Sequence, residues 1–115
     1  GDVYKRQAFA GLELDRLVHE KARLMILTYL ASSAEAETGF TELRDALSMS
    51  AGNLSIQLKT LEEAGYLSTS KRFQNNKPFT GIRLTSVGQD ALERYLNVME
   101  QLVAAIRQPA PGGNE

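Results

Sequence analysis

The sequence contains no cysteine and only one histidine among its 115 residues. Without cysteine, the chain has no disulfide bond, no thiolate zinc site and no cysteine nucleophile. The single His19 cannot by itself build a histidine-rich metal site or a catalytic triad, so we predict no metal and no cofactor. No apolar run approaches the roughly 18 residues of a membrane-spanning helix. We therefore expect a cytoplasmic protein with no membrane partner.

A large charge of either sign is also missing. The chain has 13 Lys and Arg against 14 Asp and Glu, a formal net charge of −1, which excludes a histone-like polycation. No phosphate-binding loop, G-x-S-x-G elbow or H-E-x-x-H motif occurs, so we predict that the protein is not an enzyme. Its length and its hydrophobic share of 43% are those of one ordinary globular domain.

The periodicity of apolar residues divides the chain into five predicted elements. We place the domain at residues 8–107, with a non-core or tag-like start at 1–7 and a disordered, Pro- and Gly-rich tail at 108–115. The predicted elements are a helix at 12–31, a short helix at 41–47, a helix at 51–64, a β-hairpin at 66–84 and a helix at 86–107.

Local signals mark the ends of these elements. Thr41 and Ser50 are the expected N-caps of the second and third helices, and Gly65 has the position of a left-handed C-terminal glycine. The pair Asn75-Asn76 tolerates turn dihedrals between the two strands. The string Ser86-Val87-Gly88-Gln89 matches a capping box at the start of the last helix.

This order predicts a mainly α fold with a small β-hairpin (α+β), a winged helix-turn-helix with a C-terminal dimerisation helix. In this motif the second of the two short helices enters the major groove of double-stranded DNA. The predicted element order therefore makes residues 51–64 the recognition helix and residues 66–84 the wing.

The recognition helix is expected to bury Leu54, Leu58 and Leu61 and to present small and hydrogen-bonding side chains to DNA. Asn53 and Gln57 suit adenine, and an exposed Ile56 suits a thymine methyl. The predicted contacts are Ser50, Gly52, Asn53, Ser55, Ile56, Gln57, Lys59 and Thr60. The alternative is an ordinary solvated helix face, because polar outward faces are common.

Charge is distributed unevenly along the chain. Between residues 46 and 89 the only acidic residues are Glu62 and Glu63, whereas five basic residues fall there: Lys59, Lys71, Arg72, Lys77 and Arg83. Such segregation is typical of a surface that meets phosphate. The predicted wing contacts are Lys71, Arg72, Asn75, Asn76 and Lys77. The alternative is an edge hairpin whose basic residues prevent strand pairing.

The last helix has more apolar surface than one small domain is expected to cover. We predict a homodimer in which two recognition helices, about 34 Å apart, read a near-palindrome. The predicted interface residues are Leu92, Tyr95, Leu96, Met99, Leu102, Val103 and Ile106, with help from Phe9, Leu12 and Leu14. The alternative is that this apolar stripe belongs entirely to the subunit's own core.

Four strings in this order resemble the MarR/ArsR-type winged-helix transcription regulators, especially the small "winged helix DNA-binding domain" group. They are LDRLVHEKARLMIL, FTELRDAL, GNLSIQLKTLEEAGYL and KPFTGIRLTSVGQDALERYL, and the likeness covers residues 12–105. The resemblance implies a homodimeric, prokaryotic, repressor-like protein. It assigns Asn53, Ser55, Gln57 and Lys59 to the DNA groove and Lys71, Arg72 and Lys77 to the wing. This sequence departs from the group at Ile56 and Gln57, where Ser and His are common.

Sequence-specific DNA binding by a transcriptional regulator is the leading hypothesis. The alternative is a winged-helix module that binds another protein and not DNA, which the near-neutral net charge favours. A small-molecule effector is compatible with the sequence, in a cleft lined by Met25, Tyr29, Phe40 and Tyr95. These four residues are also ordinary candidates for the core.

Overall fold

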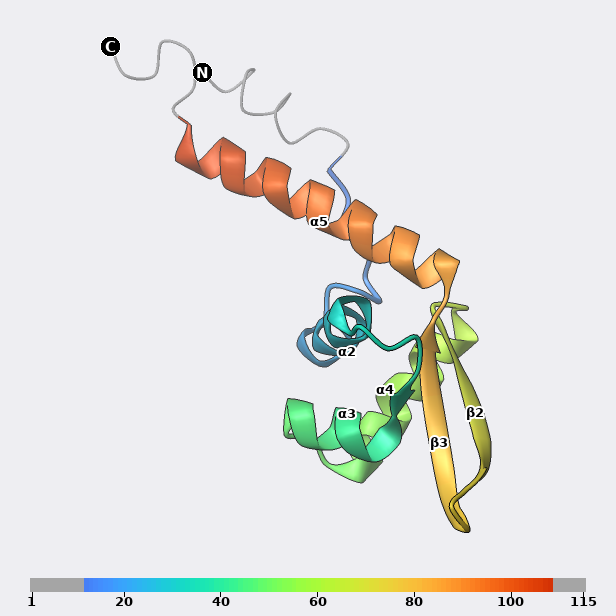
Figure 1. Ribbon diagram of the computed structural model, residues 1–115. Coiled ribbons are helices and arrows are strands. Elements are labelled where there is room, and N and C mark those ends of the chain that lie inside the picture. Colours follow the sequence, from blue (N-terminus) through green and yellow to red (C-terminus); the bar gives the residue numbers. More distant parts are fainter. Residues whose placement is uncertain (1–11, 109–115) are drawn as a thin grey trace, which may run out of the picture.

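The computed structural model describes residues 12–108. Their fold is a small helical body with a long protruding hairpin and one long helix across its top (Figure 1). The predictions for residues 1–7, for Phe9 and for the tail beyond Gln108 lie outside the described residues. The elements are α2 (Lys21–Ser32), β1 (Thr38–Gly39), α3 (Phe40–Leu47), α4 (Ala51–Glu63), β2 (Leu67–Gln74), β3 (Lys77–Leu84) and α5 (Ser86–Arg107).

The helix predicted for residues 12–31 is wrong over its first half, because the structure begins α2 only at Lys21. Asp15 Oδ1 accepts hydrogen bonds from the backbone N–H groups of Leu17 (2.8 Å) and Val18 (3.2 Å), which closes a turn instead of a helix. The two carboxylate oxygens of Glu20 then accept from Ala22 and Arg23 N–H at 3.0 Å each. Glu20 is thus a true N-cap that periodicity had placed inside a helix.

The turn between α3 and α4 has the helix-turn-helix form that the sequence predicted. Helix α3 begins directly after β1 at Phe40, with Gly39 and not Thr41 at its N-cap, so that predicted cap is wrong. Ser48 ends α3 in the left-handed region (φ 53°). Ser50 Oγ accepts a hydrogen bond from Asn53 N–H at 3.1 Å and caps α4 as predicted.

The hairpin is closed by a two-residue turn in which Asn75 and Asn76 both have positive φ, 53° and 63°. This is the dihedral pattern of a tight hairpin whose twist matches that of its strands. The strands run to the turn itself, since Gln74 pairs with Lys77. Strand β3 lies between β1 and β2 in the antiparallel sheet, but β1 reaches only Gly81 and Ile82. Pro78 therefore sits where one side of β3 is open, as its missing N–H requires.

Helix α5 packs very closely on the loop after α4. The N-cap is Thr85, one residue before the predicted Ser86, and its Oγ1 accepts from Gly88 N–H (3.0 Å) and donates to the Gly65 carbonyl (2.6 Å). A Cβ on Gly88 would lie 2.0 Å from the Tyr66 carbonyl oxygen, so only glycine fits there. Gly65 itself has φ +81°, the left-handed conformation that the sequence predicted after α4.

One core holds the described residues together. Its members come from the segment before α2 and from all four helices, β2 and β3; they are Val18, Ile26, Leu27, Leu30, Leu43, Leu54, Leu58, Leu61, Leu67, Ile82, Ala91, Leu92 and Tyr95. Four helices with a small three-stranded sheet confirm the predicted winged helix-turn-helix class.

Within residues 12–108, no helix is both long and apolar enough to cross a membrane.

Candidate nucleic-acid interface

Helix α4 lies across the body with one face buried and one face free. Leu54, Leu58 and Leu61 are 0–5% exposed and fix the helix against the core. The opposite side is exposed at Gly52, Asn53, Ser55, Ile56 and Lys59, all of which the sequence placed at the DNA surface. Ile56 is 64% exposed, which is unusual for a large apolar side chain on a helix with an apolar core face available.

Two predicted contacts on α4 already have partners within the protein. The Gln57 side chain is half-buried, and its Oε1 accepts a hydrogen bond from Arg23 Nη1 at 2.8 Å. Its Nε2 donates to Asn53 Oδ1 at 3.2 Å. Thr60 Oγ1 donates to the Ile56 carbonyl of its own helix at 3.1 Å. Neither Gln57 nor Thr60 is therefore a free group on the outer face.

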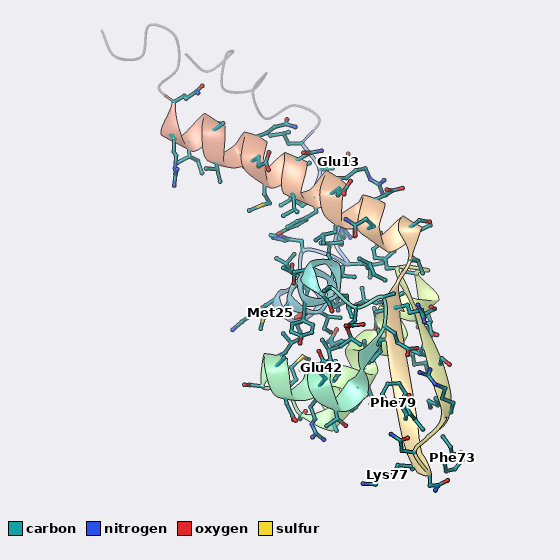
Figure 2. The ribbon with its side chains drawn as sticks, viewed as in Figure 1. Glu13, Met25, Glu42, Phe73, Lys77 and Phe79 are labelled. Carbon is teal, nitrogen blue, oxygen red and sulfur yellow. The ribbon has the colours of Figure 1, made fainter. Side chains whose placement is uncertain are left out.

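The wing presents exposed polar and basic side chains near its tip. Lys71, Asn75, Asn76 and Lys77 are all exposed. Figure 2 shows Lys77 and Phe73 at the far end of the hairpin, pointing to opposite sides. Phe73 is 76% exposed, so an aromatic ring stands in solvent beside the turn.

Arg72 differs from the other wing residues because its charge is paired. Its Nη2 and Nη1 donate to the two carboxylate oxygens of Glu37 at 2.6 and 3.0 Å, and its guanidinium stacks over Phe79 with 4.8 Å to the ring centroid. Arg83 Nε approaches the same carboxylate at 3.7 Å. A Cβ at Gly81 would collide with Glu37 Oε2 at 2.3 Å, so Gly81 makes the space for this carboxylate.

The pKa values of the pair reflect this contact. The hydrogen bonds from Arg72, helped by the charges of Arg72 and Arg83, lower the pKa of Glu37 despite partial desolvation. The same hydrogen bonds raise the pKa of Arg72. Glu37 precedes the segment 46–89 that is poor in acidic residues, yet it lies against the wing. The positive charge of the wing is therefore smaller than the sequence indicated.

A groove separates α4 from the wing. Its volume is about 450 Å³, and its walls are Phe40, Ser55, Leu58, Lys59, Glu62, Thr69, Lys71 and Thr80. Lys59 and Lys71 come from opposite walls and carry the positive charge of the groove. Glu62, another lining residue, accepts two hydrogen bonds at Oε2 from Thr69, one from its N–H (3.1 Å) and one from its Oγ1 (2.9 Å). These bonds tie the wing to α4, so the two surfaces keep a fixed relation.

The predicted dimer residues on α5 fall into two groups. Leu92 and Tyr95 are 3% and 4% exposed, and Tyr95 Oη is hydrogen-bonded to His19 Nδ1 at 2.8 Å. These two are core residues of the subunit, so placing them at a dimer interface was wrong. Towards the C-terminal end, the helix extends beyond the body (Figure 1), and Leu96, Val103 and Ile106 are exposed. Met99 and Leu102 are half-buried, as are Leu12 and Leu14 of the segment before α2.

Three side chains that matter at this surface were not singled out from the sequence. Phe73 is an apolar residue two positions before the solvent-exposed turn at Asn75 and Asn76, and that position was a usable signal. Arg23 and Glu37 lie 34 and 35 residues from their partners Gln57 and Arg72. No local pattern in a single sequence reports pairings over such separations.

The residues suggested for an effector cleft have different surroundings in the structure, although Met25 and Tyr29 lie one turn apart on α2. Phe40 lines the groove beside α4, whereas Tyr95 contacts His19. Tyr29 Oη donates to Glu42 Oε2 at 2.7 Å, and Met25 lies on the outer side of α2 (Figure 2). Within the part of the chain that the structure describes, no three His, Asp or Glu side chains are grouped to hold a metal ion.

Comparison with known proteins agrees with this geometry. The sequence profile of the family described as "Winged helix DNA-binding domain" matches residues 22–103. The chain belongs to this family. The winged helix domain is also 31% identical over 87 residues to an uncharacterized protein of Methanocaldococcus jannaschii, a match that covers 76% of this chain and 92% of the relative.

Solved structures show the same fold. A transcriptional regulator homologue from Pyrococcus horikoshii superposes with a TM-score of 0.77 at 20% identity, over 89% of this chain and 99% of that chain. A DNA complex of MepR from S. aureus gives 0.61 at 16% identity, over 89% and 77%. A mutant of MarR from E. coli gives 0.63 at 18% identity, over 86% and 67%. The resemblance to MarR-type winged helices is therefore confirmed for the fold.

Proposed function

We propose that this winged helix domain is a sequence-specific DNA-binding regulator that reads a near-palindromic operator as a homodimer and represses transcription. The observation that carries the proposal is the placement of Lys59 and Lys71 on facing walls of the groove between α4 and the wing. A phosphate backbone that crosses this groove would contact both lysines while α4 enters the major groove. MepR, a protein with this fold, has been solved as a complex with DNA, which supports DNA as the proposed partner.

The number of free basic groups sets the expected strength of binding. Lys59, Lys71 and Lys77 are exposed and lack ion pairs among the described residues, whereas Arg72 and Arg83 share Glu37. Three lysines per subunit give six in a dimer. The logarithm of the association constant should then fall with the logarithm of salt concentration with a slope of about −5. Such binding is tight only when both subunits engage.

In the proposed dimer, a second copy of this chain packs against the exposed end of α5. Leu96, Met99, Val103 and Ile106 follow each other at spacings of three, four and three residues, so they lie on one helical face. This face continues the side on which Leu92 and Tyr95 are buried in the body. Pairing two such ends about a two-fold axis buries them and places two copies of α4 on one side of the dimer.

The deciding experiment is selection of bound duplexes from a random DNA pool, with light scattering of the free protein. A recovered palindrome and a dimeric mass support the proposal. Lys59→Ala and Lys71→Ala should each weaken binding to all duplexes similarly and reduce the salt slope by about two, because each substitution removes one lysine from each subunit of the dimer. Failure to bind any duplex at low salt contradicts the proposal.

The second candidate function is a protein-binding module. The exposed Ile56 and Phe73 favour it, because large apolar side chains on a free surface are common at protein interfaces. In that case a protein partner would bind with little salt dependence, and no duplex would be enriched in the selection.

A further inference from the structure

We propose that Arg23, a residue of α2 that does not reach the DNA surface, determines base preference by fixing which end of the Asn53 amide faces the DNA. This inference rests on the proposed DNA-binding function. It concerns a chain of three side chains, Arg23, Gln57 and Asn53, which we call the amide relay.

The first member of the amide relay is held firmly in place. The Arg23 side chain is 18% exposed, and its Nε donates to the Leu17 carbonyl at 2.7 Å. Leu17 belongs to the turn closed by Asp15, whose Oδ1 accepts from Leu17 N–H. Arg23 Nη1 then donates to Gln57 Oε1 at 2.8 Å. The guanidinium is thus anchored on one side to the turn before α2 and presented on the other to α4.

The chemistry of the guanidinium gives the relay a direction. Arginine can only donate hydrogen bonds, so Gln57 must turn its oxygen, and not its nitrogen, towards Arg23. The Gln57 NH2 group then points one helical turn back and donates to Asn53 Oδ1 at 3.2 Å. Asn53 must in turn offer its oxygen to Gln57. Among the described residues, no acceptor contacts Asn53 Nδ2, and the side chain is exposed.

A free asparagine amide can rotate by half a turn and offer either a donor or an acceptor to a base. In the amide relay, Asn53 instead offers its NH2 group outward. Acceptors in the major groove are N7 and O6 of guanine, N7 of adenine and O4 of thymine, whereas cytosine presents a donor. The structure therefore assigns Asn53 as the residue that reads the base and Arg23 and Gln57 as positioning residues.

The first test uses the free protein and does not depend on DNA. The side-chain NH2 resonances of Asn53 and Gln57 are recorded by 15N–1H NMR in the unmodified protein and in Arg23→Ala. We expect both pairs of resonances to shift in Arg23→Ala. Lys21→Ala is the matched control, because Lys21 is exposed on the same helix and makes no hydrogen bond or ion pair among the described residues. Unchanged Asn53 resonances in a folded Arg23→Ala would overturn the amide relay.

The second test measures base preference with a selected duplex and its single-base variants. Asn53→Ala should identify the base pair that Asn53 reads, by lowering discrimination there about fivefold or more. Arg23→Ala and Gln57→Glu should lower discrimination at that same base pair, while Lys21→Ala leaves it unchanged. Gln57→Glu keeps an acceptor for Arg23 but removes the donor to Asn53. This variant therefore breaks the relay while the contact between Arg23 and α4 is kept, so we expect the protein to remain folded.

The two tests separate the inference from the function on which it rests. If the unmodified protein enriches no duplex, the proposed DNA-binding function fails, whereas the NMR result still decides whether the relay fixes Asn53. If the protein binds a specific duplex and both Arg23→Ala and Gln57→Glu retain full discrimination at the Asn53 position, the inference is wrong.

Discussion

Arg72 and Glu37 form a two-pronged ion pair, with N···O distances of 2.6 and 3.0 Å, between the middle of the wing and the residue before β1. Both prongs occupy guanidinium nitrogens that are then not free to bind a phosphate in the proposed DNA complex. The same carboxylate lies 3.7 Å from Arg83. One acidic residue thus contacts two of the basic residues that made the wing look strongly positive, and it cancels one unit of their charge.

Removing the charge of this carboxylate should strengthen DNA binding. In Glu37→Gln, Arg72 and Arg83 lose their ionic partner and become available to phosphate. We expect higher affinity for all duplexes at low salt and a steeper salt slope, by about one for each arginine that then binds a phosphate. Fluorescence anisotropy at several salt concentrations measures both. Glu35→Gln is the control, because Glu35 is exposed and its carboxylate is unpaired among the described residues; an equal effect there would contradict the specific role of Glu37.

Gly52→Ala should separate stability from DNA binding. A Cβ at Gly52 meets nothing within 4 Å, and the residue lies in the first turn of α4. Replacing a helical glycine by alanine should raise the free energy of unfolding by up to about 1 kcal/mol. The added methyl group also stands on the face proposed to approach the sugar-phosphate backbone, so DNA affinity should fall. Urea unfolding and a DNA titration measure the two effects; unchanged affinity would show that α4 does not approach DNA at this end.

Gly88→Ala should have the opposite effect on stability. Its Cβ would lie 2.0 Å from the Tyr66 backbone oxygen, a group that cannot move aside without displacing the loop after α4. We expect a loss of about 2 kcal/mol in the free energy of unfolding, as for other overpacked sites. Thermal melting followed by circular dichroism measures it, and a melting temperature equal to that of the unmodified protein would contradict the packing described for α5.

Ile106→Glu should dissociate the proposed dimer without unfolding the subunit. Ile106 is 79% exposed at the free end of α5, so the subunit loses little packing, whereas a dimer would have to bury the new carboxylate. Light scattering should change from a dimeric to a monomeric mass. Val87→Glu makes the same substitution on the same helix, at a residue 53% exposed outside the apolar face, and should remain dimeric. A monomeric mass for the unmodified protein would contradict the proposed dimer.

The raised pKa of Tyr66 predicts how the free energy of unfolding changes at alkaline pH. Burial, together with the hydrogen bond that Tyr66 donates to Asp15, raises the pKa of the phenol from 10.0 to about 12. The folded state therefore holds this proton more tightly than the unfolded state does. The resulting stabilisation is complete below pH 10 and is lost as the pH rises towards 12. In Tyr66→Phe, the free energy of unfolding from urea titrations should fall less over this interval than in the unmodified protein; an equal fall would contradict the assignment.

Part of the interface could be predicted because its signals are local. The Leu54, Leu58 and Leu61 stripe determines which side of α4 is buried, so the exposed side follows from helical geometry alone. The tight turn at Asn75 and Asn76 likewise follows from residues that tolerate positive φ. The start of α2 could not be predicted in this way, because the Glu20 cap and the Asp15 turn compete with a helix that the apolar spacing also allows.

The sequence by itself determined the order of the elements, the buried face of α4 and the wing that follows it, since these depend on spacings of a few residues. Only the tertiary structure decided which polar groups remain free. Gln57 is held by Arg23 and Arg72 is held by Glu37, each pair more than thirty residues apart in the chain. A hydrogen bond or an ion pair depends on distances of about 3 Å in space, and folding, not the local sequence pattern, brings those atoms together.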